Sequence, residues 1–237
     1  TANIGSWEYI IEPEQLNWSE QTYHIHGLPL NYEPSVSEGI DFYCDESKSI
    51  ILELFSACLE HGRSFDAKLQ IQHTSGKKRW VRTIGKPEYR NGEVVRIYGV
   101  FQDIHEQQMN NLSILKAKEK AESIRKEILD GSDFGFQALL NSEDPGSANN
   151  RGELGWVKRG VFVPDFEAVA FRLKENEVSE VVETEFGFHI IQLQEKKGNR
   201  IKARHILITP KTDMTNSLAA SDQMREIKTK LEEKTIT

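Results

Sequence analysis

The stretch VPDFEAVAFRLKENEVSEVVETEFGFHIIQLQEKK, residues 163–197, predicts one helix followed by two strands. Pro164 suits the first turn of a helix, because the N–H that proline lacks would be unpaired there in any case. We expect this helix to run through Phe171, and the remainder to form a short strand, a turn and a longer strand. The next segment, NRIKARHILITPK, supplies one more strand, and the Lys-Gly-Asn sequence at 197–199 is a plausible hairpin turn.

The residues before this stretch also mix helix and strand. Gly131 ends a preceding helix, and Ser132 or Asp133 caps the next one, FGFQALLNS. A loop rich in Gly, Ser and Asn at 142–153 then leads to the strand ELGWV. The second half of the chain is therefore predicted to be an α/β sheet domain.

A polar helix is predicted over residues 106–130, with an apolar seam whose steps of three and four residues are heptad-like. The helix should be long and partly exposed, and should join two domains. Its seam needs a partner, which we expect to be a second chain near the first domain and the sheet of the second domain further on. A homodimer through this helix is one possibility. The seam consists of Ile114, Ala117, Ala121, Ile124 and Ile128.

The first half predicts an α+β domain with one curved antiparallel sheet. Residues 5–30 suggest short strands and turns, and residues 47–61 have the apolar spacing of a helix that ends at Gly62. Three strands follow, beginning with SFDAKLQIQH, in which alternate residues are apolar. The Asn-Gly pair at 91–92 predicts a tight hairpin between the second and third strands.

Composition restricts the classes of function. The chain has 237 residues, enough for two domains, and a formal net charge of −7 that falls mostly in residues 1–110. No basic stripe typical of nucleic-acid binding is visible, and no apolar run is long enough to span a membrane. The two cysteines and the scattered histidines of the first half fit no metal motif. Because the first residue is Thr1, we expect a fragment or a processed product.

The first half resembles a PAS domain of the kind found in bacterial sensor kinases. The resemblance covers about residues 3–108 and rests on WSEQTYHIHG, IDFYCDES and KRWVRTIGKPEYRNGEVVRIYGVFQDIHEQQ. PAS domains bind different ligands or none, so the ligand stays open; neither a flavin-adduct cysteine motif nor a well-placed haem histidine is found. No phosphoacceptor segment or ATP-binding half follows, which excludes kinase activity in this chain.

The second half resembles a parvulin-type peptidyl-prolyl isomerase of bacterial extracytoplasmic foldases. The motifs are SEDPGSANNRGELGW, VPDFEAVAFRLKENEVSEVVETEFGFHIIQL and ARHILI, within about residues 117–210. In the family the ARHILI strand comes first, whereas here it stands at 203–208. The domain is therefore either circularly permuted or followed by the start of a second copy. In both cases Ala203–Ile208 should pair antiparallel with Gly187–Leu193 and bring two histidines together.

The parvulin resemblance implies a site for isomerising X–Pro bonds without a metal or another cofactor. It assigns a polar floor and an amide-facing carboxylate, and an apolar pocket for the prolyl ring. Each residue also has a structural alternative, namely core packing for the apolar residues and histidines and a loop or cap role for the carboxylate. The implied catalytic residues are His205, His189 and Asp144, and the implied substrate-binding residues are Leu154, Phe162 and Phe166.

The predicted organisation is thus a PAS-like sensor domain at 1–108, a linker helix at 109–130 and a parvulin-like domain at 131–210. Residues 117–130 serve as the first helix of that domain, and 211–237 form the start of a second repeat or a C-terminal helix. The expected function is prolyl isomerisation of proline-containing polypeptides. The alternatives are a non-enzymatic signalling fragment with an inert peptide-binding module, and an artificial chimera. The parvulin half suggests an extracytoplasmic location and the PAS half a cytoplasmic one, so the location stays open.

Overall fold

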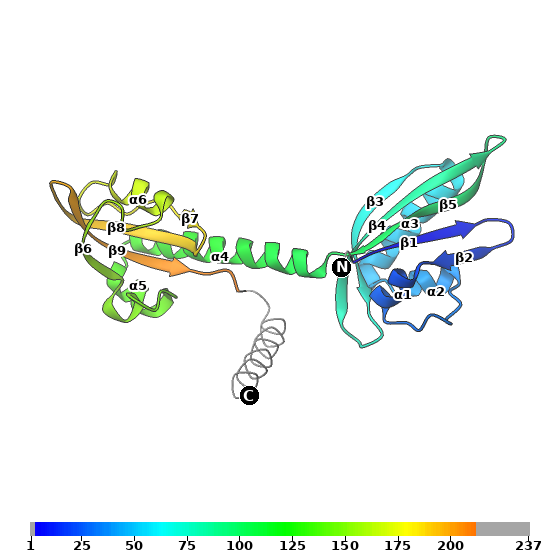
Figure 1. Cartoon of the computed structure of the whole chain (residues 1–237), viewed down its shortest axis with the longest axis horizontal. Helices are drawn as coiled ribbons and strands as arrows, with labels where there is room; N and C mark the ends of the chain where they lie inside the picture. Colours follow the sequence, from blue (N-terminus) through cyan, green and yellow to red (C-terminus); the bar gives the residue numbers. More distant parts are fainter. Residues whose placement is uncertain (1–2, 212–237) are drawn as a thin grey trace, which may run out of the picture. The chain divides into compact units, whose positions relative to one another are not determined.

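The computed structural model describes residues 3–211 (Figure 1). It divides into two compact units, the first ending at Gln108 and the second beginning at Met109. Each unit has its own antiparallel sheet. The predicted second repeat or C-terminal helix falls, apart from its first residue, outside the described residues.

The first unit carries a five-stranded sheet of order β2-β1-β5-β4-β3, in which neighbouring strands are antiparallel. The predicted meander of three strands is confirmed, and the hairpin turn has left-handed backbone at Asn91 (φ 55°) and Gly92 (φ 89°). The elements are β1 (Ile4–Ile10), β2 (Gln15–Trp18), α1 (Glu20–His26), α2 (Val36–Asp41), α3 (Asp45–His61), β3 (Phe65–Gln72), β4 (Lys78–Arg90) and β5 (Glu93–Asp103).

One prediction for this unit was wrong. Residues 20–26 form the helix α1, where only strands and turns were expected. Glu20 lies in its first turn and Gly27 ends it in the left-handed conformation, both ordinary helix signals. The alternating apolar and polar residues of this short segment resemble a strand, but Ile25 and His26 are buried on one side of the helix.

The second unit carries a four-stranded sheet of order β6-β9-β8-β7. The predicted helices at 106–130 and after Pro164 are confirmed, and Asp133 caps α5 by accepting a hydrogen bond from the N–H of Phe136 at 2.8 Å. The elements are α4 (His105–Leu129), which begins in the first unit, α5 (Phe134–Asn141), the 3-10 helix η1 (Ala148–Asn150), β6 (Glu153–Lys158), α6 (Pro164–Ala170), β7 (Val182–Thr184), β8 (Gly187–Lys197) and β9 (Arg200–Ile208).

The displaced strand occupies an interior position in this sheet. β9 lies between β6 and β8, and it pairs antiparallel with both. Ile191 lies opposite His205, and His189 lies opposite Leu207, which confirms the predicted pairing. The strand therefore completes the sheet although it follows all the other strands of the sheet in the sequence.

The two faces of the sheet carry separate apolar clusters, because successive strand residues point to opposite faces. On one face, Phe188, Ile190, Ile206 and Ile208 pack against α4 and α5. On the other, Ile191, Leu193, Ile201 and Ala203 pack against α6. Figure 1 shows α6 on the opposite side of the sheet from α5. The odd-numbered residues near the end of β9, including His205, thus share the α6 face.

The seam of α4 has its main partner within the second unit. Ala117, Ala121, Ile124 and Ile128 are buried against the sheet, as expected for the later part of the helix. Ile114 is 43% exposed, so the seam is uncovered only at its beginning. The four buried positions are consequently not free to form a dimer.

Candidate active site

Two buried histidines lie side by side on the α6 face of the second sheet. His189 comes from β8 and His205 from β9, and the two residues are 4% and 6% exposed respectively. The two Nδ1 atoms are 3.2 Å apart, and the rings are nearly parallel with centroids 5.5 Å apart. The contact follows from the strand register and places two titratable rings in a water-poor environment.

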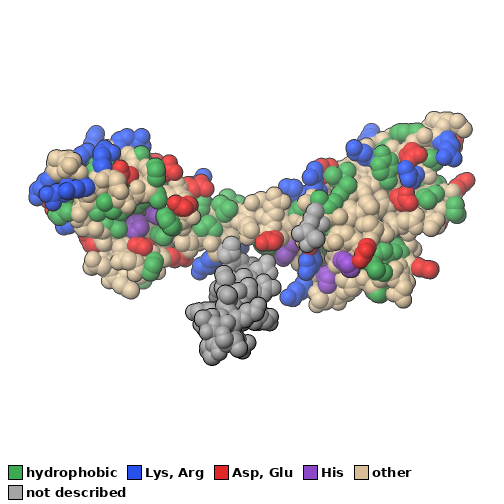
Figure 2. All heavy atoms as spheres, in the orientation of Figure 1, with side chains coloured by type: hydrophobic (Ala, Val, Ile, Leu, Met, Phe, Trp, Pro, Cys, Tyr) green, Lys and Arg blue, Asp and Glu red, His purple; other side chains and the backbone are tan. Residues whose placement is uncertain are grey.

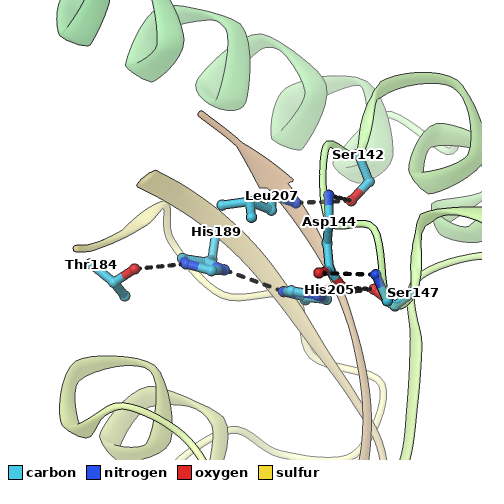
Figure 3. Close-up of polar contacts among 8 residues, drawn as sticks. Ser142, Asp144, Ser147, Thr184, His189, His205 and Leu207 are labelled. Atoms are coloured by element: carbon cyan, nitrogen blue, oxygen red, sulfur yellow. Dashed lines mark hydrogen bonds and ion pairs between the residues drawn. The ribbon is translucent and has the colours of Figure 1, made fainter. Parts of the chain in front are cut away.

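A carboxylate reaches this pair from the loop after α5. The loop is tied to β9 at one end by the N–H of Leu207, which donates to Ser142 Oγ at 3.1 Å. At the other end the N–H of His205 donates to the carbonyl oxygen of Gly152 at 2.8 Å. Between these anchors, Asp144 Oδ2 lies 2.9 Å from His205 Nε2 (Figure 3).

Gly152 explains part of the Arg-Gly-Glu-Leu-Gly motif. Its φ is 79°, and a Cβ atom at this position would lie 2.3 Å from the carbonyl oxygen of His205. Only glycine combines this left-handed backbone with so close an approach to β9. The motif therefore holds the loop against the strand that carries His205.

The hydrogen bonds form one continuous chain, which Figure 3 shows from Thr184 to Ser147. The N–H of Phe186 donates to Thr184 Oγ1 at 3.1 Å, and Thr184 Oγ1 lies 2.8 Å from His189 Nε2. The histidine pair follows, and His205 Nε2 then contacts both Asp144 Oδ2 and Ser147 Oγ, the latter at 3.0 Å. Ser147 also donates to Asp144 Oδ2.

The pKa values of the three titratable groups determine which of them donate and which accept along this chain. Burial, together with the nearby His205, lowers the pKa of His189 to about 4. Burial also lowers the pKa of His205, although Asp144 opposes the shift. Burial raises the pKa of Asp144, but hydrogen bonds from Ser147 and His205 outweigh it and leave that pKa below its ordinary value. Near neutral pH the carboxylate is therefore ionised and both rings are neutral.

One proton arrangement satisfies every bond in the chain. Ionised Asp144 can only accept, so His205 Nε2–H donates to it and His205 Nδ1 becomes an acceptor. His189 Nδ1–H then donates to His205, which leaves His189 Nε2 to accept from the hydroxyl of Thr184. The Thr184 oxygen is already accepting from the backbone, so its proton is available for this bond. The hydrogen bonds thus all run in one direction, from Thr184 through the two neutral histidines to the negatively charged Asp144.

Phe166 and Phe162 cover the histidine pair, and we call these two rings the aromatic wall. The Phe166 ring, 3% exposed, meets His189 and His205 edge to face, with centroids 5.2 Å and 5.6 Å away. Phe162 packs on Phe166 at 4.7 Å and is itself half-buried. Leu154 joins the same cluster from β6.

The structure thus gathers all six sequence-predicted site residues on one face of the second unit. Sequence reasoning missed Thr184 and Ser147, which complete the hydrogen-bond chain at its two ends. The sequence does contain a signal for Thr184. It lies five residues before His189, and the tight turn between β7 and β8 pairs it with Gly187, which brings it close to His189. Ser147 lies in an irregular loop, where spacing alone does not predict contacts.

The first unit holds a separate small cavity of about 60 Å³, bordered by Trp7, Trp18 and His26 among others. His26, one of the histidines that fit no metal motif, is 1% exposed and stacked between Trp18 and Phe101. Burial lowers the pKa of His26 to about 4.

Within residues 3–211 no group of three or more His, Cys, Asp or Glu side chains is arranged to hold a metal ion. Among the helices of the same residues, none is both long and apolar enough to cross a membrane.

Comparison with known families agrees with both halves of this description. Residues 15–101 match the model of the PAS fold, and residues 101–197 match the model of the PPIC-type PPIASE domain. The chain joins a PAS fold to a PPIC-type domain. The second match ends before β9, so His205 lies outside it although the strand is part of the same sheet.

The relatives of the PPIC-type unit are named as foldases and chaperones. Foldase protein PrsA of Staphylococcus aureus is 53% identical over 78 residues, which cover 32% of this chain and 24% of that protein. Chaperone SurA of Dechloromonas aromatica is 47% identical over 92 residues, covering 39% of this chain and 21% of that protein. The chain therefore matches only about a quarter of the length of these relatives.

A solved structure similar to the PAS unit is the N-terminal domain of a diguanylate cyclase with a PAS/PAC sensor from Marinobacter aquaeolei. It is 19% identical, has a TM-score of 0.42, and the match covers 44% of this chain and 98% of that chain.

Proposed function

We propose that the PPIC-type unit catalyses cis–trans isomerisation of X–Pro bonds in polypeptides, as part of a chain that also carries a PAS fold. The observation that carries this proposal is the chain of hydrogen bonds from Thr184 through both histidines to Asp144, lying beneath the ring of Phe166. The foldase and chaperone names of the relatives support a polypeptide substrate.

Isomerisation of an X–Pro bond needs only a surface that excludes water and is complementary to the twisted amide. Rotation about a peptide bond meets a barrier of about 18–20 kcal/mol, because the C–N bond has partial double-bond character. At the top of the barrier the amide is twisted, its nitrogen regains a lone pair, and its carbonyl oxygen loses negative charge. A catalyst must bind this twisted form more tightly than either planar form. No covalent bond is made or broken, so the rotation itself needs neither a metal nor a nucleotide.

The arrangement of charges favours the twisted amide. A carbonyl oxygen placed near Asp144 is repelled less when it has lost its partial negative charge, so the carboxylate destabilises the planar form more than the twisted one. Asp144 is partly buried, with its side chain 23% exposed, and charges interact more strongly where water is partly excluded. Neutral His189 and His205 hold Asp144 in place without cancelling its charge.

The apolar residues would bind the prolyl ring. Phe162 and Leu154 are half-buried and pack against the cluster that contains the buried Phe166, so they contribute to its accessible part. Packing against a hydrophobic surface selects proline over polar residues and desolvates the bond to be rotated.

Exchange spectroscopy by NMR on a short Ala-Ala-Pro-Phe peptide tests the proposal directly. The full chain at catalytic concentration should accelerate cis–trans exchange, and Phe162→Ala should lower the rate about tenfold because the prolyl ring loses its contact. Phe136→Ala is the matched control, since Phe136 is 54% exposed on α5 of the same unit. Failure of the wild-type chain to accelerate exchange, with the fold intact by circular dichroism, would refute the proposed activity.

A further inference from the structure

Cationic side chains gather at one end of the PPIC-type sheet, where the β8–β9 hairpin turns and β6 ends. Figure 2 shows the blue side chains massed over this end of the unit. Five of the six are exposed and the sixth, Lys202, is half-buried. We call this set the basic end; it consists of Lys158, Arg159, Lys196, Lys197, Arg200 and Lys202.

Strand register builds the basic end. Lys158 and Lys197 both lie opposite Arg200, one from β6 and one from β8, so three cations stand in a row across three strands. Like charges placed directly opposite one another destabilise a sheet. Residues 109–211 contain as many acidic as basic side chains, so this concentration is local rather than a property of the unit. The described carboxylates that contact it are Glu195, 3.2 Å from Lys197 Nζ, and Glu175, which accepts from the N–H of Lys196.

The basic end is continuous with the proposed isomerase site through Phe171. The Arg159 guanidinium lies over the Phe171 ring, 4.2 Å from its centroid, and Lys196 Nζ donates to the Phe171 carbonyl oxygen at 2.8 Å. Phe171 belongs to the same apolar cluster as Phe166. These two cations are therefore held on the α6 face. Arg200, with Lys158 and Lys197 opposite it, lies on the other face of the sheet at the same end.

The distance from the aromatic wall to the Arg159 charge sets how far from its proline a substrate must carry an acidic residue. Phe166 and Phe171 are five residues apart at the end of α6, which corresponds to about 7–8 Å along a helix. Adding the 4.2 Å between the Arg159 guanidinium and the Phe171 ring places that charge up to about 12 Å from the aromatic wall, or up to about four residues of an extended peptide.

We propose that the basic end selects acidic polypeptide segments, so that the preferred substrates carry Asp or Glu within about four residues of the isomerised proline. This inference rests on the proposed function, because it concerns substrates of the same site. Electrostatic complementarity raises the rate of encounter and excludes partners of like charge. A polypeptide, rather than a nucleic acid, is indicated because the cations continue directly from a site suited to a prolyl bond.

The test compares two peptides that share Ala-Ala-Pro-Phe and carry either Glu or Lys at the second to fourth positions on both sides of the proline. In 10 mM salt the full chain should isomerise the Glu peptide with a kcat/KM three- to tenfold above that of the Lys peptide. The difference should shrink in 0.3 M salt, because the screening length falls from about 30 Å at 0.01 M to below 10 Å. Equal rates for the two peptides at low salt would overturn the inference and leave the isomerase activity standing.

The variant Arg159→Gln/Arg200→Gln removes one charge from each face of the basic end. It should reduce the preference at least twofold, with unchanged turnover of the uncharged peptide. Lys118→Gln/Lys126→Gln is the matched control, since both lysines are exposed on α4 outside the basic end. An equal loss of preference in both double variants would show that overall charge, and not the basic end, is responsible.

Binding is measured separately, so that an absence of isomerase activity does not decide the question. By fluorescence anisotropy, the full chain should bind a labelled Glu peptide at least threefold more tightly than the Lys peptide, and the Arg159→Gln/Arg200→Gln variant should lose this difference. Tighter binding of a labelled single-stranded oligonucleotide than of the Glu peptide would contradict the choice of partner.

Discussion

The hydroxyl of Thr184 donates to the nitrogen of His189 that carries no proton. Because His189 Nδ1–H donates to His205, the Nε2 atom of His189 must accept, and the Thr184 oxygen, which itself accepts from the N–H of Phe186, supplies the proton. At the other end, Asp144 accepts from His205 Nε2–H. Two side chains at the ends thus stabilise one pair of tautomers of the two buried rings between them.

Replacing Thr184 tests this assignment. Thr184→Val keeps the shape but leaves His189 Nε2 without a donor, so kcat/KM for an X–Pro peptide should fall about tenfold. The free energy of unfolding should fall by about 1 kcal/mol, the usual worth of one hydrogen bond. Thr184→Ser restores the hydroxyl and should restore most of the activity. An unaltered rate in the valine variant would mean that the tautomers are not important for the reaction.

At the level of elements, regular patterns predicted most of the fold. The alternation in β3, the Asn-Gly turn, the proline that begins α6 and the seam of α4 all correspond to observed elements, because each signal is local. Sequence alone left open whether 203–208 completes the sheet, since pairing with β6 and β8 depends on distant residues. The helix α1 was missed because seven residues are too few for a clear period.

Two of the three isoleucines of the α4 seam provide a matched pair for stability. Ile124 is 4% exposed against the sheet and Ile114 is 43% exposed. Ile124→Ala should lower the free energy of unfolding of the PPIC-type unit by about 2–4 kcal/mol, because it removes buried methyl groups and leaves a cavity. Ile114→Ala should cost less than about 0.5 kcal/mol. Urea unfolding measures both, and equal losses would contradict the placement of the seam.

Considered as a whole molecule, the chain carries a buried neutral histidine in each unit. The pKa of His26 in the PAS unit and that of His189 in the PPIC-type unit are both lowered by burial to about 4. An unfolded histidine titrates near pH 6.5. Between about pH 6.5 and pH 4 the unfolded state therefore binds more protons than the folded state, and stability decreases as the pH falls.

Both units should accordingly lose stability in this window. Each histidine changes the free energy of unfolding by up to about 1.4 kcal/mol per pH unit. Urea unfolding at pH 7 and pH 5, with hydrogen exchange on peptides from each unit, separates the two responses. His26→Phe keeps an aromatic ring between Trp18 and Phe101, so it should reduce the acid sensitivity of the PAS unit alone. Stability that stays constant or rises on acidification would contradict the assignment of neutral histidines.

The central claim is that Asp144, held by His205 from the displaced strand, acts on an X–Pro bond in the PPIC-type unit. The most direct measurement is the catalysed cis–trans exchange rate of a short X–Pro peptide by the full chain and by Asp144→Ala. Asp130→Ala serves as the control, since Asp130 is an exposed carboxylate at the end of α4. We predict acceleration by the wild type and the control, and a rate at least tenfold lower for Asp144→Ala with its fold intact. Equal rates for Asp144→Ala and the wild type would contradict the claim.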